Sequence, residues 1–223
     1  TDKHVLVASG TSSGKTEAVF FPMLTLLSQK PSRSVGIMYI GPLKALINDQ
    51  FKRLGELLED SGIPVWPWHG DISQSVKNKA INQAQGVLQI TPESLEALLM
   101  RHPGDASRLF SDLRFVVIDE IHALMNEDRG AQVICLISRL EKITGCRTRR
   151  IGLSATLNDY EPVMDFLSAG SQKDVVTVGM KTYKRTISLC MESFIFPQEN
   201  ESETKPVEEI KKYNDFIYMQ CHN

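Results

Sequence analysis

An apolar run near the N-terminus gives way to small residues and then to a second apolar pattern with a different period. Residues 5–8 read Val-Leu-Val-Ala, which predicts a buried strand, and residues 9–16 read Ser-Gly-Thr-Ser-Ser-Gly-Lys-Thr. Apolar side chains then recur at helical spacing through residues 20–27. A strand, a loop of small residues that ends in Gly-Lys-Thr, and a helix form the layout of a phosphate-binding loop.

The residue types of this loop suit a triphosphate. Small side chains allow successive backbone N–H groups to turn toward phosphates, and the following helix N-terminus adds a partial positive charge. We expect Lys15 to reach the β- and γ-phosphates and the Thr16 hydroxyl to coordinate Mg²⁺. Ser9 stands where the strict pattern has glycine, and a surface turn that merely contains Gly-Lys-Thr is the structural alternative. The predicted nucleotide-binding residues are Ser9, Gly10, Thr11, Ser12, Ser13, Gly14, Lys15 and Thr16.

Composition indicates an ordinary globular protein. The 223 residues are 42% hydrophobic and 23% charged, with a formal net charge of −2. A polyanionic partner must therefore meet a local basic surface. No run approaches the roughly 18 consecutive apolar residues of a membrane span, so we expect no membrane partner. The four cysteines lack the spacing of zinc sites, and we expect reduced thiols in a cytoplasmic protein.

Strand-like and helix-like stretches alternate up to residue 178. Because the predicted strands are apolar on both faces, the pattern favours a parallel sheet covered by helices on both sides, an α/β fold of three layers. The expected strands are 5–8, 35–40, 64–69, 87–90, 115–118, 151–153 and 174–178. The expected helices are 20–27, 43–58, 93–100, 131–143 and 160–167, with a further polar helix that Ser73 caps.

Two acidic residues follow the strand at 115–118. Ligands of open parallel sheets bind at the carboxyl ends of the strands, so Asp119 and Glu120 should face the phosphate loop. Asp119 would then hold Mg²⁺ through water, and Glu120 would orient or deprotonate the water that attacks the γ-phosphate. His122 is expected to join them in a relay. The alternatives are a solvated acidic strand end and a structural histidine.

A third polar group follows the strand at 151–153. Ser154 and Thr156 flank Ala155, and we expect their hydroxyls to hydrogen-bond to His122 or Glu120 and so transmit the state of the nucleotide across the sheet end. A plain helix cap is the alternative.

Together these segments resemble the superfamily 2 helicases of the DEAD/DEAH-box type. Residues 9–16, 119–122 and 154–156 resemble their motifs I, II and III, in the same order. Residues 41–50, Gly-Pro-Leu-Lys-Ala-Leu-Ile-Asn-Asp-Gln, look like motif Ia, and residues 90–95 look like the nucleic-acid motif that follows it. With His69-Gly70-Asp71 between them, these two are most similar to the large helicase-related (Lhr) branch.

The resemblance implies a RecA-like motor domain over residues 1–180 that binds and hydrolyses Mg-ATP. Its catalytic residues would be Lys15, Asp119, Glu120, His122, Ser154 and Thr156, with Thr16 and Asp119 on the metal. The backbone of DNA or RNA would lie against Pro42, Leu43, Lys44, Gly70, Thr91 and Pro92.

The resemblance also implies that this chain holds only part of a motor. Residues 181–215 would be an interdomain strand and linker, and residues 216–223 would begin a second RecA-like domain. Because the chain starts almost directly in a strand, we expect a fragment, with the adenine-reading motif and the arginines of the second domain outside it. A missing arginine commonly removes a factor of about 10³ to 10⁵ from phosphoryl transfer, so the chain alone should hydrolyse ATP slowly.

Three other functions are compatible with the same residues. One is a double-stranded DNA translocase of a restriction or remodelling system, and another is a non-motor P-loop kinase. The third is a nucleic-acid-binding module that has lost hydrolysis, for which the serines at positions 9 and 12, where the family usually has alanine and glycine, are the only indication.

Overall fold

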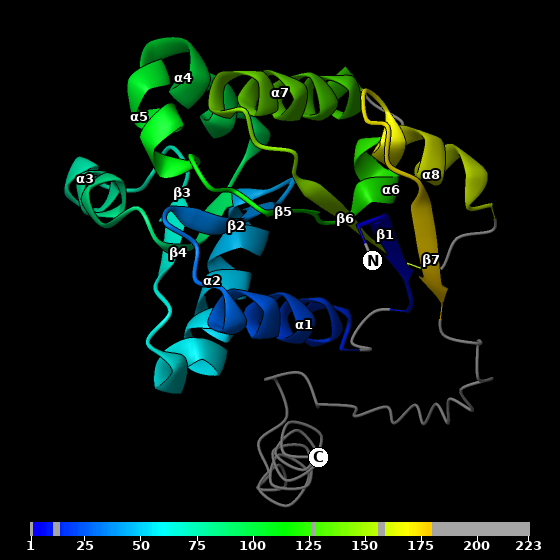
Figure 1. Cartoon of the computed structure of the whole chain (residues 1–223), viewed down its shortest axis with the longest axis horizontal. Helices are drawn as coiled ribbons and strands as arrows, with labels where there is room; N and C mark the ends of the chain where they lie inside the picture. The colour runs from blue at the N-terminus through cyan, green and yellow to red at the C-terminus, as the bar shows by residue number, and fades with distance from the viewer. Residues whose placement is uncertain (1, 11–13, 126–127, 156–158, 180–223) are drawn as a thin grey trace, which may run out of the picture. The chain divides into compact units, whose positions relative to one another are not determined.

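Strands and helices alternate along the chain in the computed structural model, which describes residues 2–10, 14–125, 128–155 and 159–179 (Figure 1). The strands are β1 (His4–Ala8), β2 (Val35–Ile40), β3 (Val65–Trp68), β4 (Gly86–Ile90), β5 (Phe115–Ile118), β6 (Arg149–Ser154) and β7 (Val175–Gly179). The helices are α1 (Lys15–Gln29), α2 (Lys44–Leu58), α3 (Gln74–Gln83), α4 (Pro92–Arg101), α5 (Pro103–Leu109), α6 (Ile121–Leu124), α7 (Asp128–Thr144) and α8 (Glu161–Ser168), with a short 3₁₀ helix η1 (Glu59–Ser61).

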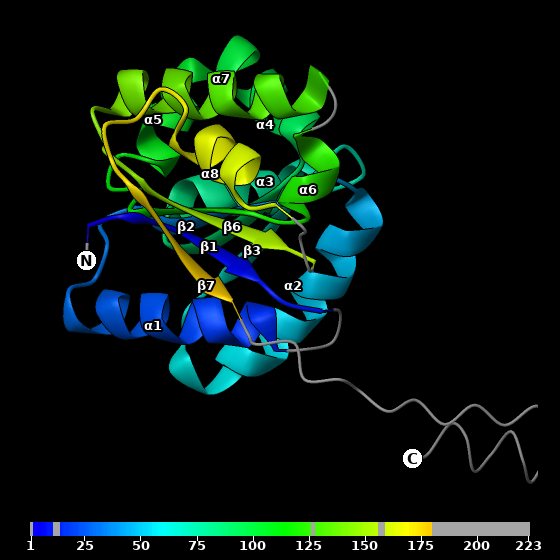
Figure 2. The ribbon, with the colours of Figure 1, turned by 90° about the vertical axis from the view of Figure 1, so that its right-hand side faces the viewer.

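The strands pair in the order β3-β4-β2-β5-β6-β1-β7, and every described pair is parallel. In Figure 2 the arrows of β1, β6 and β7 accordingly point the same way. Parallel strands need crossover connections, which the helices supply. The predicted three-layer α/β fold with a parallel sheet is therefore confirmed.

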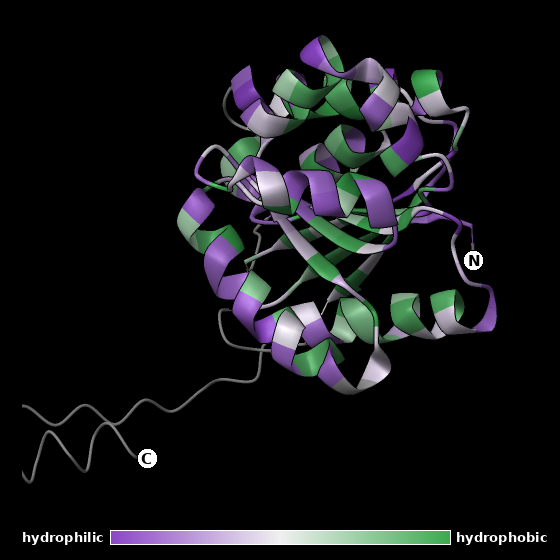
Figure 3. Ribbon diagram, turned by 90° about the vertical axis from the view of Figure 1, so that its left-hand side faces the viewer, coloured by the Kyte–Doolittle hydropathy of each residue, from purple (hydrophilic) through white to green (hydrophobic). Residues whose placement is uncertain are grey.

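Successive strand residues pack on opposite faces of the sheet. Ile37 and Tyr39 of β2 join the core under α1 and α2, whereas Met38 and Ile40 join the core under α4, α5 and α7. Figure 1 shows these two helical layers on either side of the sheet, and in Figure 3 green apolar strands lie between helices that carry the purple polar residues. Because helices cover both faces of the sheet, the strands are continuous apolar runs in the sequence. These apolar runs are the feature that predicted the strands.

Local chemistry explains where several helices begin. Thr91 precedes α4, and its hydroxyl accepts a hydrogen bond from the N–H of Ser94 at 3.4 Å, while Pro92 occupies the first turn, where its missing N–H costs nothing. Gly14 precedes α1 in the left-handed conformation, with φ of 77°. Ser73 precedes α3 as predicted, but its side chain makes no capping hydrogen bond to the helix.

The expected strands and helices up to residue 178 all occur, with boundaries that differ by a few residues, and the end points of β5 match the prediction. Three elements were not predicted: η1, α5 and α6. The sequence of α5 includes Pro103 and Gly104, which are poor helix formers, and α6 has only four residues, too few to show a period. The interdomain strand, the linker and the start of a second domain predicted beyond residue 180 lie outside the described residues.

A buried polar network closes the edge of the sheet where the strands begin. Arg150 in β6 is fully buried and donates to the carbonyls of Leu167 and Ala169 and to Glu141 at 3.2 Å. The backbone N–H of Arg150 donates to Nδ1 of His4 in β1. These contacts join β1, β6, α7 and α8 away from the strand ends that carry the predicted site.

No described helix is long and apolar enough to cross a membrane. Cys135 and Cys146, the two cysteines within the described ranges, are free thiols, as expected.

Candidate functional site

The residues predicted to bind nucleotide lie at the carboxyl ends of three adjacent strands. The phosphate loop follows β1, Asp119 follows β5, and Ser154 ends β6. Because β6 lies between β5 and β1 in a parallel sheet, these segments meet at one edge. Thr11, Ser12, Ser13 and Thr156, also predicted for this site, lie outside the described residues.

Ser154 connects the phosphate loop to the acidic segment. Its backbone carbonyl accepts hydrogen bonds from the N–H of Ser9 at 3.2 Å and from Nζ of Lys15 at 3.0 Å. Its hydroxyl lies 3.1 Å from Nδ1 of His122, so the predicted contact between Ser154 and His122 is present. One residue therefore contacts both sides of the candidate site.

Lys15 begins α1 and turns back over the end of β1. Its ammonium group donates to the carbonyls of Ser9 at 2.9 Å and of Ser154. Both acceptors are neutral, and within the described part of the chain no carboxylate pairs with this ammonium. An uncompensated cation at the start of a 15-residue helix suits a phosphate group.

Asp119 is held at the end of β5 with 8% of its surface exposed. Oδ2 accepts a hydrogen bond from the hydroxyl of Tyr39 in β2, and Oδ1 accepts one from the N–H of Glu120 at 2.9 Å. Burial and the nearby Asp119 charge raise the pKa of Tyr39 well above its usual value, so this hydroxyl stays protonated and donates. Sequence reasoning missed Tyr39, because its place in an apolar strand marks it only as a core residue.

Glu120 precedes α6 in the left-handed conformation, with φ of 46°. For a residue other than glycine this conformation costs about 1 to 3 kcal/mol and is concentrated at functional sites. Oε2 of Glu120 lies 3.4 Å from Nδ1 of His122, which also contacts the Ser154 hydroxyl. Nδ1 of His122 therefore lies between Glu120 and Ser154.

The charges at this edge fit a metal-bound triphosphate. The nearly buried carboxylate of Asp119 has two hydrogen-bond donors, but no basic side chain within the described ranges forms an ion pair with it. Thr16, 9% exposed at the start of α1, supplies a hydroxyl oxygen of the kind that Mg²⁺ accepts. A divalent cation would compensate Asp119, and phosphate would compensate Lys15, so the residues present fit both groups.

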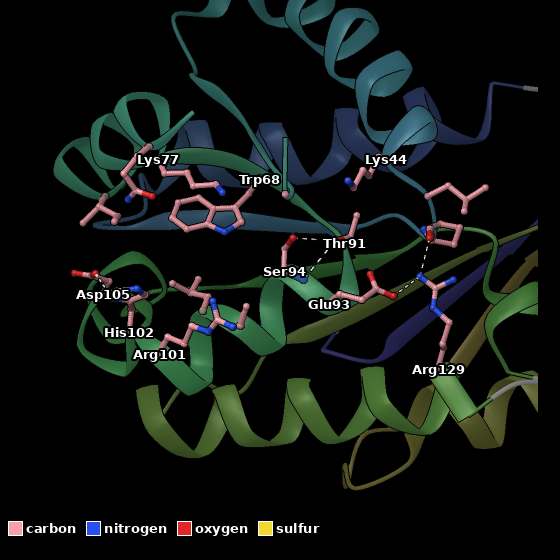
Figure 4. Close-up of a pocket in the computed structure, with 17 residues that line it drawn as sticks. Lys44, Trp68, Lys77, Thr91, Glu93, Ser94, Arg101, His102, Asp105 and Arg129 are labelled. Carbon is pink, nitrogen blue, oxygen red and sulfur yellow. Dashed lines mark hydrogen bonds and ion pairs between the residues drawn. The ribbon is translucent and has the colours of Figure 1, made fainter. Parts of the chain in front are cut away.

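A second group of predicted residues lines a cleft of about 680 Å³ at the ends of β2, β3 and β4 (Figure 4). Of the six residues predicted to contact nucleic acid, Pro42, Leu43, Lys44, Gly70 and Thr91 line this cleft. Pro92 does not line it and is buried in the first turn of α4. Since β2 is bonded to β5, the cleft adjoins the phosphate-loop edge of the same sheet.

Two of the cations in this cleft already have acidic partners. Nζ of Lys44 lies 2.9 Å from Asp71, and the guanidinium of Arg129 lies 2.6 Å from Glu93 and 2.8 Å from the carbonyl of Pro42. Arg129 therefore joins α7 to the two predicted nucleic-acid segments. The sequence holds no local signal for this contact, because the three residues are far apart along the chain.

Other lining residues were not predicted to contact a ligand. They include Trp68 of β3, Lys77 of α3, and Arg101 at the end of α4. Lys77 was recognised only as part of a polar helix, and Trp68 only as a strand residue. Trp68 directly precedes the His-Gly-Asp segment at residues 69–71 and Lys77 follows it closely, and that proximity was the available signal.

A parallel three-layer sheet with a phosphate-loop lysine, an Asp-Glu pair and a serine meeting at its carboxyl edge defines a P-loop NTPase domain of the RecA-like type. The chain belongs to the DEAD/DEAH box helicase family, whose model matches residues 1–164. This family favours the helicase interpretation over the P-loop kinase alternative.

Relatives support the Lhr branch within superfamily 2. The chain is 34% identical over 201 residues to the ATP-dependent helicase Lhr-Core of Methanothermobacter thermautotrophicus, covering 82% of this chain and 23% of that protein. It is 34% identical over 179 residues to an activating signal cointegrator 1 complex subunit 3-like protein of Dictyostelium discoideum, covering 75% of this chain and 8% of that protein. The chain thus spans about a quarter or less of these two curated relatives.

A solved structure also supports the Lhr branch. The Mycobacterium smegmatis helicase Lhr bound to ssDNA and AMP-PNP matches with a TM-score of 0.69 and 27% identity, over 99% of this chain and 29% of that one.

Proposed function

We propose that this chain is the first ATP-binding motor domain of an ATP-dependent helicase that acts on nucleic acid. The observation that carries the proposal is the position of Ser154, whose carbonyl contacts the phosphate loop while its hydroxyl contacts His122 of the acidic segment. Family membership and the AMP-PNP and ssDNA of the Lhr neighbour support the same function.

In this proposal the chain's own residues bind and orient the nucleotide. Lys15 exchanges its two carbonyl partners for phosphate oxygens, and the loop amide at Gly14 contributes a further donor. Thr16 and Asp119 hold Mg²⁺, which when bound neutralises charge that develops on the phosphates. Tyr39 keeps the Asp119 carboxylate oriented through its hydroxyl.

Glu120 is proposed as the residue that orients the attacking water and accepts its proton at a carboxylate oxygen. His122 and Ser154 hold that carboxylate in place and connect it to the end of β6. Thr156, outside the described residues, is proposed to share the coupling role of Ser154.

The adjoining cleft is proposed to bind the backbone of DNA or RNA. Lys44, Gly70 and Thr91 line it, and Pro42 lies where β2 ends, one strand away from Asp119. We propose that a second RecA-like domain completes the catalytic site with arginine, and that residues 181–215 lead to it. This chain alone is expected to hydrolyse ATP slowly, since an arginine supplied by another domain contributes a factor of about 10³ to 10⁵.

The test is the ATPase rate of the intact protein with and without single-stranded nucleic acid, alongside Glu120→Gln. We expect stimulation by the single strand and a loss of at least 100-fold in turnover for Glu120→Gln, because general-base catalysis contributes roughly 10² to 10⁴. Glu56→Gln, which changes an exposed acid of α2 in the same way, should retain the wild-type rate. An unstimulated ATPase, or a Glu120→Gln enzyme as fast as Glu56→Gln, would contradict the proposal.

A further inference from the structure

Arg129 in α7 contacts two segments that line the proposed nucleic-acid cleft, residues 42–44 and 91–93, here called the two cleft segments. One nitrogen of its guanidinium donates to the carbonyl of Pro42 at 2.8 Å and to the carboxylate of Glu93 at 2.6 Å. Figure 4 shows the Arg129 side chain reaching from α7 to Glu93. Because hydrogen bonds of ionised groups are roughly twice as strong as neutral ones, this guanidinium fixes both cleft segments relative to α7.

The start of α7 is also packed against the short helix that follows Glu120. That helix, α6, begins at Ile121 and ends at Leu124. Gly130, the neighbour of Arg129, lies so close to α6 that a Cβ at this glycine would stand 2.5 Å from the carbonyl of Leu124. Close-packed elements transmit displacement instead of absorbing it. A shift at the start of α7 is therefore shared with the segment that carries Glu120.

A second connection runs through the backbone at the carboxyl edge of the sheet. The N–H of Asp119 donates at 3.0 Å to the carbonyl of Ile40, the last residue of β2. The N–H of Gly41 donates at 3.1 Å to the carbonyl of Ile90, the last residue of β4. The end of β2 therefore contacts the acidic segment on one side and the chain that leads into α4 on the other.

Together these contacts form a closed ring. The ring passes from Asp119 to the end of β2, through Arg129 into α7, and through α6 back to Glu120. The other contacts in the ring are made by backbone atoms, so Arg129 is the member that a substitution can remove without altering the backbone.

We propose that Arg129 is a positioning residue that holds the acidic segment, residues 119–122, and the two cleft segments in one relative geometry. The inference rests on the proposed function and adds a residue through which nucleic acid regulates ATP hydrolysis. Coupling between two sites requires an element whose arrangement both sites bias, and α6 with the start of α7 is that element. Nucleic acid that moves the cleft segments carries Arg129 with them, and α6 then reorients Glu120.

A neighbouring contact between the same two helices provides a matched comparison. Nε2 of Gln132 in α7 donates to the carboxylate of Glu96 in α4 at 2.7 Å, about one helical turn from Arg129. This hydrogen bond joins α7 to α4 without involving the end of β2. If Arg129 only held α7 against α4, the two contacts would be equivalent, so Gln132→Ala separates positioning from helix packing.

The experiment measures the ATPase rate of the intact protein at saturating single strand and without it, and takes their ratio as the stimulation factor. Substitutions that alter coupling between sites change it by roughly 2-fold to 30-fold. We expect Arg129→Gln to lower the stimulation factor by about that amount and Gln132→Ala to keep the wild-type value. Because the factor is a ratio, a smaller fraction of folded protein cancels from it.

Two further variants test the contact itself. Arg129→Lys keeps a cationic nitrogen that can donate to both acceptors, so it should retain more stimulation than Arg129→Gln. Glu93→Gln removes a half-exposed acid that lines the cleft. The strand concentration for half-maximal stimulation should then not rise, since a polyanion meets less negative charge, whereas the stimulated rate should fall. A residue that only bound the strand would not produce this split.

The outcomes separate this inference from the proposed function. If Arg129→Gln keeps the wild-type stimulation factor, or if Gln132→Ala lowers it as much as Arg129→Gln does, the positioning role is overturned while the motor function stands. The same holds if Glu93→Gln leaves the stimulated rate unchanged. If a single strand does not stimulate the unsubstituted protein, both the positioning role and the proposed function are overturned.

Discussion

Replacing Tyr39 by phenylalanine removes one buried hydroxyl and leaves the aromatic ring in place. That hydroxyl donates to Oδ2 of Asp119, the residue proposed to hold Mg²⁺. Loss of a hydrogen bond that orients a metal-binding side chain typically weakens metal affinity by about 10-fold to 100-fold. We therefore expect Tyr39→Phe to raise the Mg²⁺ concentration for half-maximal ATPase activity by that factor.

The same substitution should have a smaller effect on the fold. A hydrogen bond to a charged group contributes about 1.5 to 3 kcal/mol net, and the phenylalanine ring would still pack near Phe20, whose ring centroid lies 6.2 Å away. The free energy of unfolding in the absence of metal should therefore fall by no more than about 3 kcal/mol, measured by urea denaturation.

The assay titrates Mg²⁺ at fixed nucleotide concentration and follows both turnover and the binding of a fluorescent ATP analogue. Phe20→Leu is the control, because it alters the ring contact with Tyr39 and leaves the hydroxyl bonded to Asp119. It should lower stability without changing the Mg²⁺ requirement. If Tyr39→Phe has the Mg²⁺ requirement of the wild type, the proposed role of the hydroxyl is wrong.

Three further predictions concern the framework around the site. Arg150→Ala should lower the free energy of unfolding by about 3 to 5 kcal/mol, because it leaves buried acceptors without their donor, whereas exposed Lys142→Ala should change it by less than about 0.5 kcal/mol in the same urea titration. Burial lowers the pKa of His4 from 6.5 to about 4, so the unfolded chain takes up the proton at a higher pH than the folded protein does. The free energy of unfolding should therefore fall by about 3 kcal/mol as the pH drops from 6.5 to 4. His4→Gln should flatten this dependence in pH-dependent denaturation. Gly130→Ala would place a Cβ 2.5 Å from the carbonyl of Leu124, so thermal unfolding should show a loss of about 1 to 3 kcal/mol, and an unchanged melting temperature would contradict this packing.

The layered fold could be predicted because its signal is local and repeated. Each buried strand is apolar on both faces, and the helices between them show a 3.6-residue period, so element type follows from neighbouring residues. The four-residue helix α6 could not be predicted because it is too short to show a helical period. The order of the strands in the sheet could not be predicted for another reason, because which strands become neighbours depends on the packing of the whole domain.

The candidate site was predictable where a single segment carries the chemistry. Lys15 and Asp119 each stand in a short run whose residue types indicate phosphate or metal binding. The contacts of Tyr39 and Arg129 were not predictable, because these residues look like an ordinary strand residue and an ordinary helix residue until the fold brings Asp119 and Glu93 to them. The cleft is a similar case, since Trp68 and Arg101 both line it only because of tertiary packing.

The position of β1 has a consequence for the order in which the protein assembles during synthesis. This first strand pairs only with β6, where Val5 aligns with Ile151, and with β7, where Val5 aligns with Val176, among the described strands. The ribosome therefore makes β1, the strand that leads into the phosphate loop, before it makes either of these neighbours. Pairings of such long sequence separation form late, since the chain must close a large loop before it gains any contact. The nucleotide-binding edge should consequently be the last part of the sheet to form, so a nascent chain released before residue 149 would lack an ordered phosphate loop.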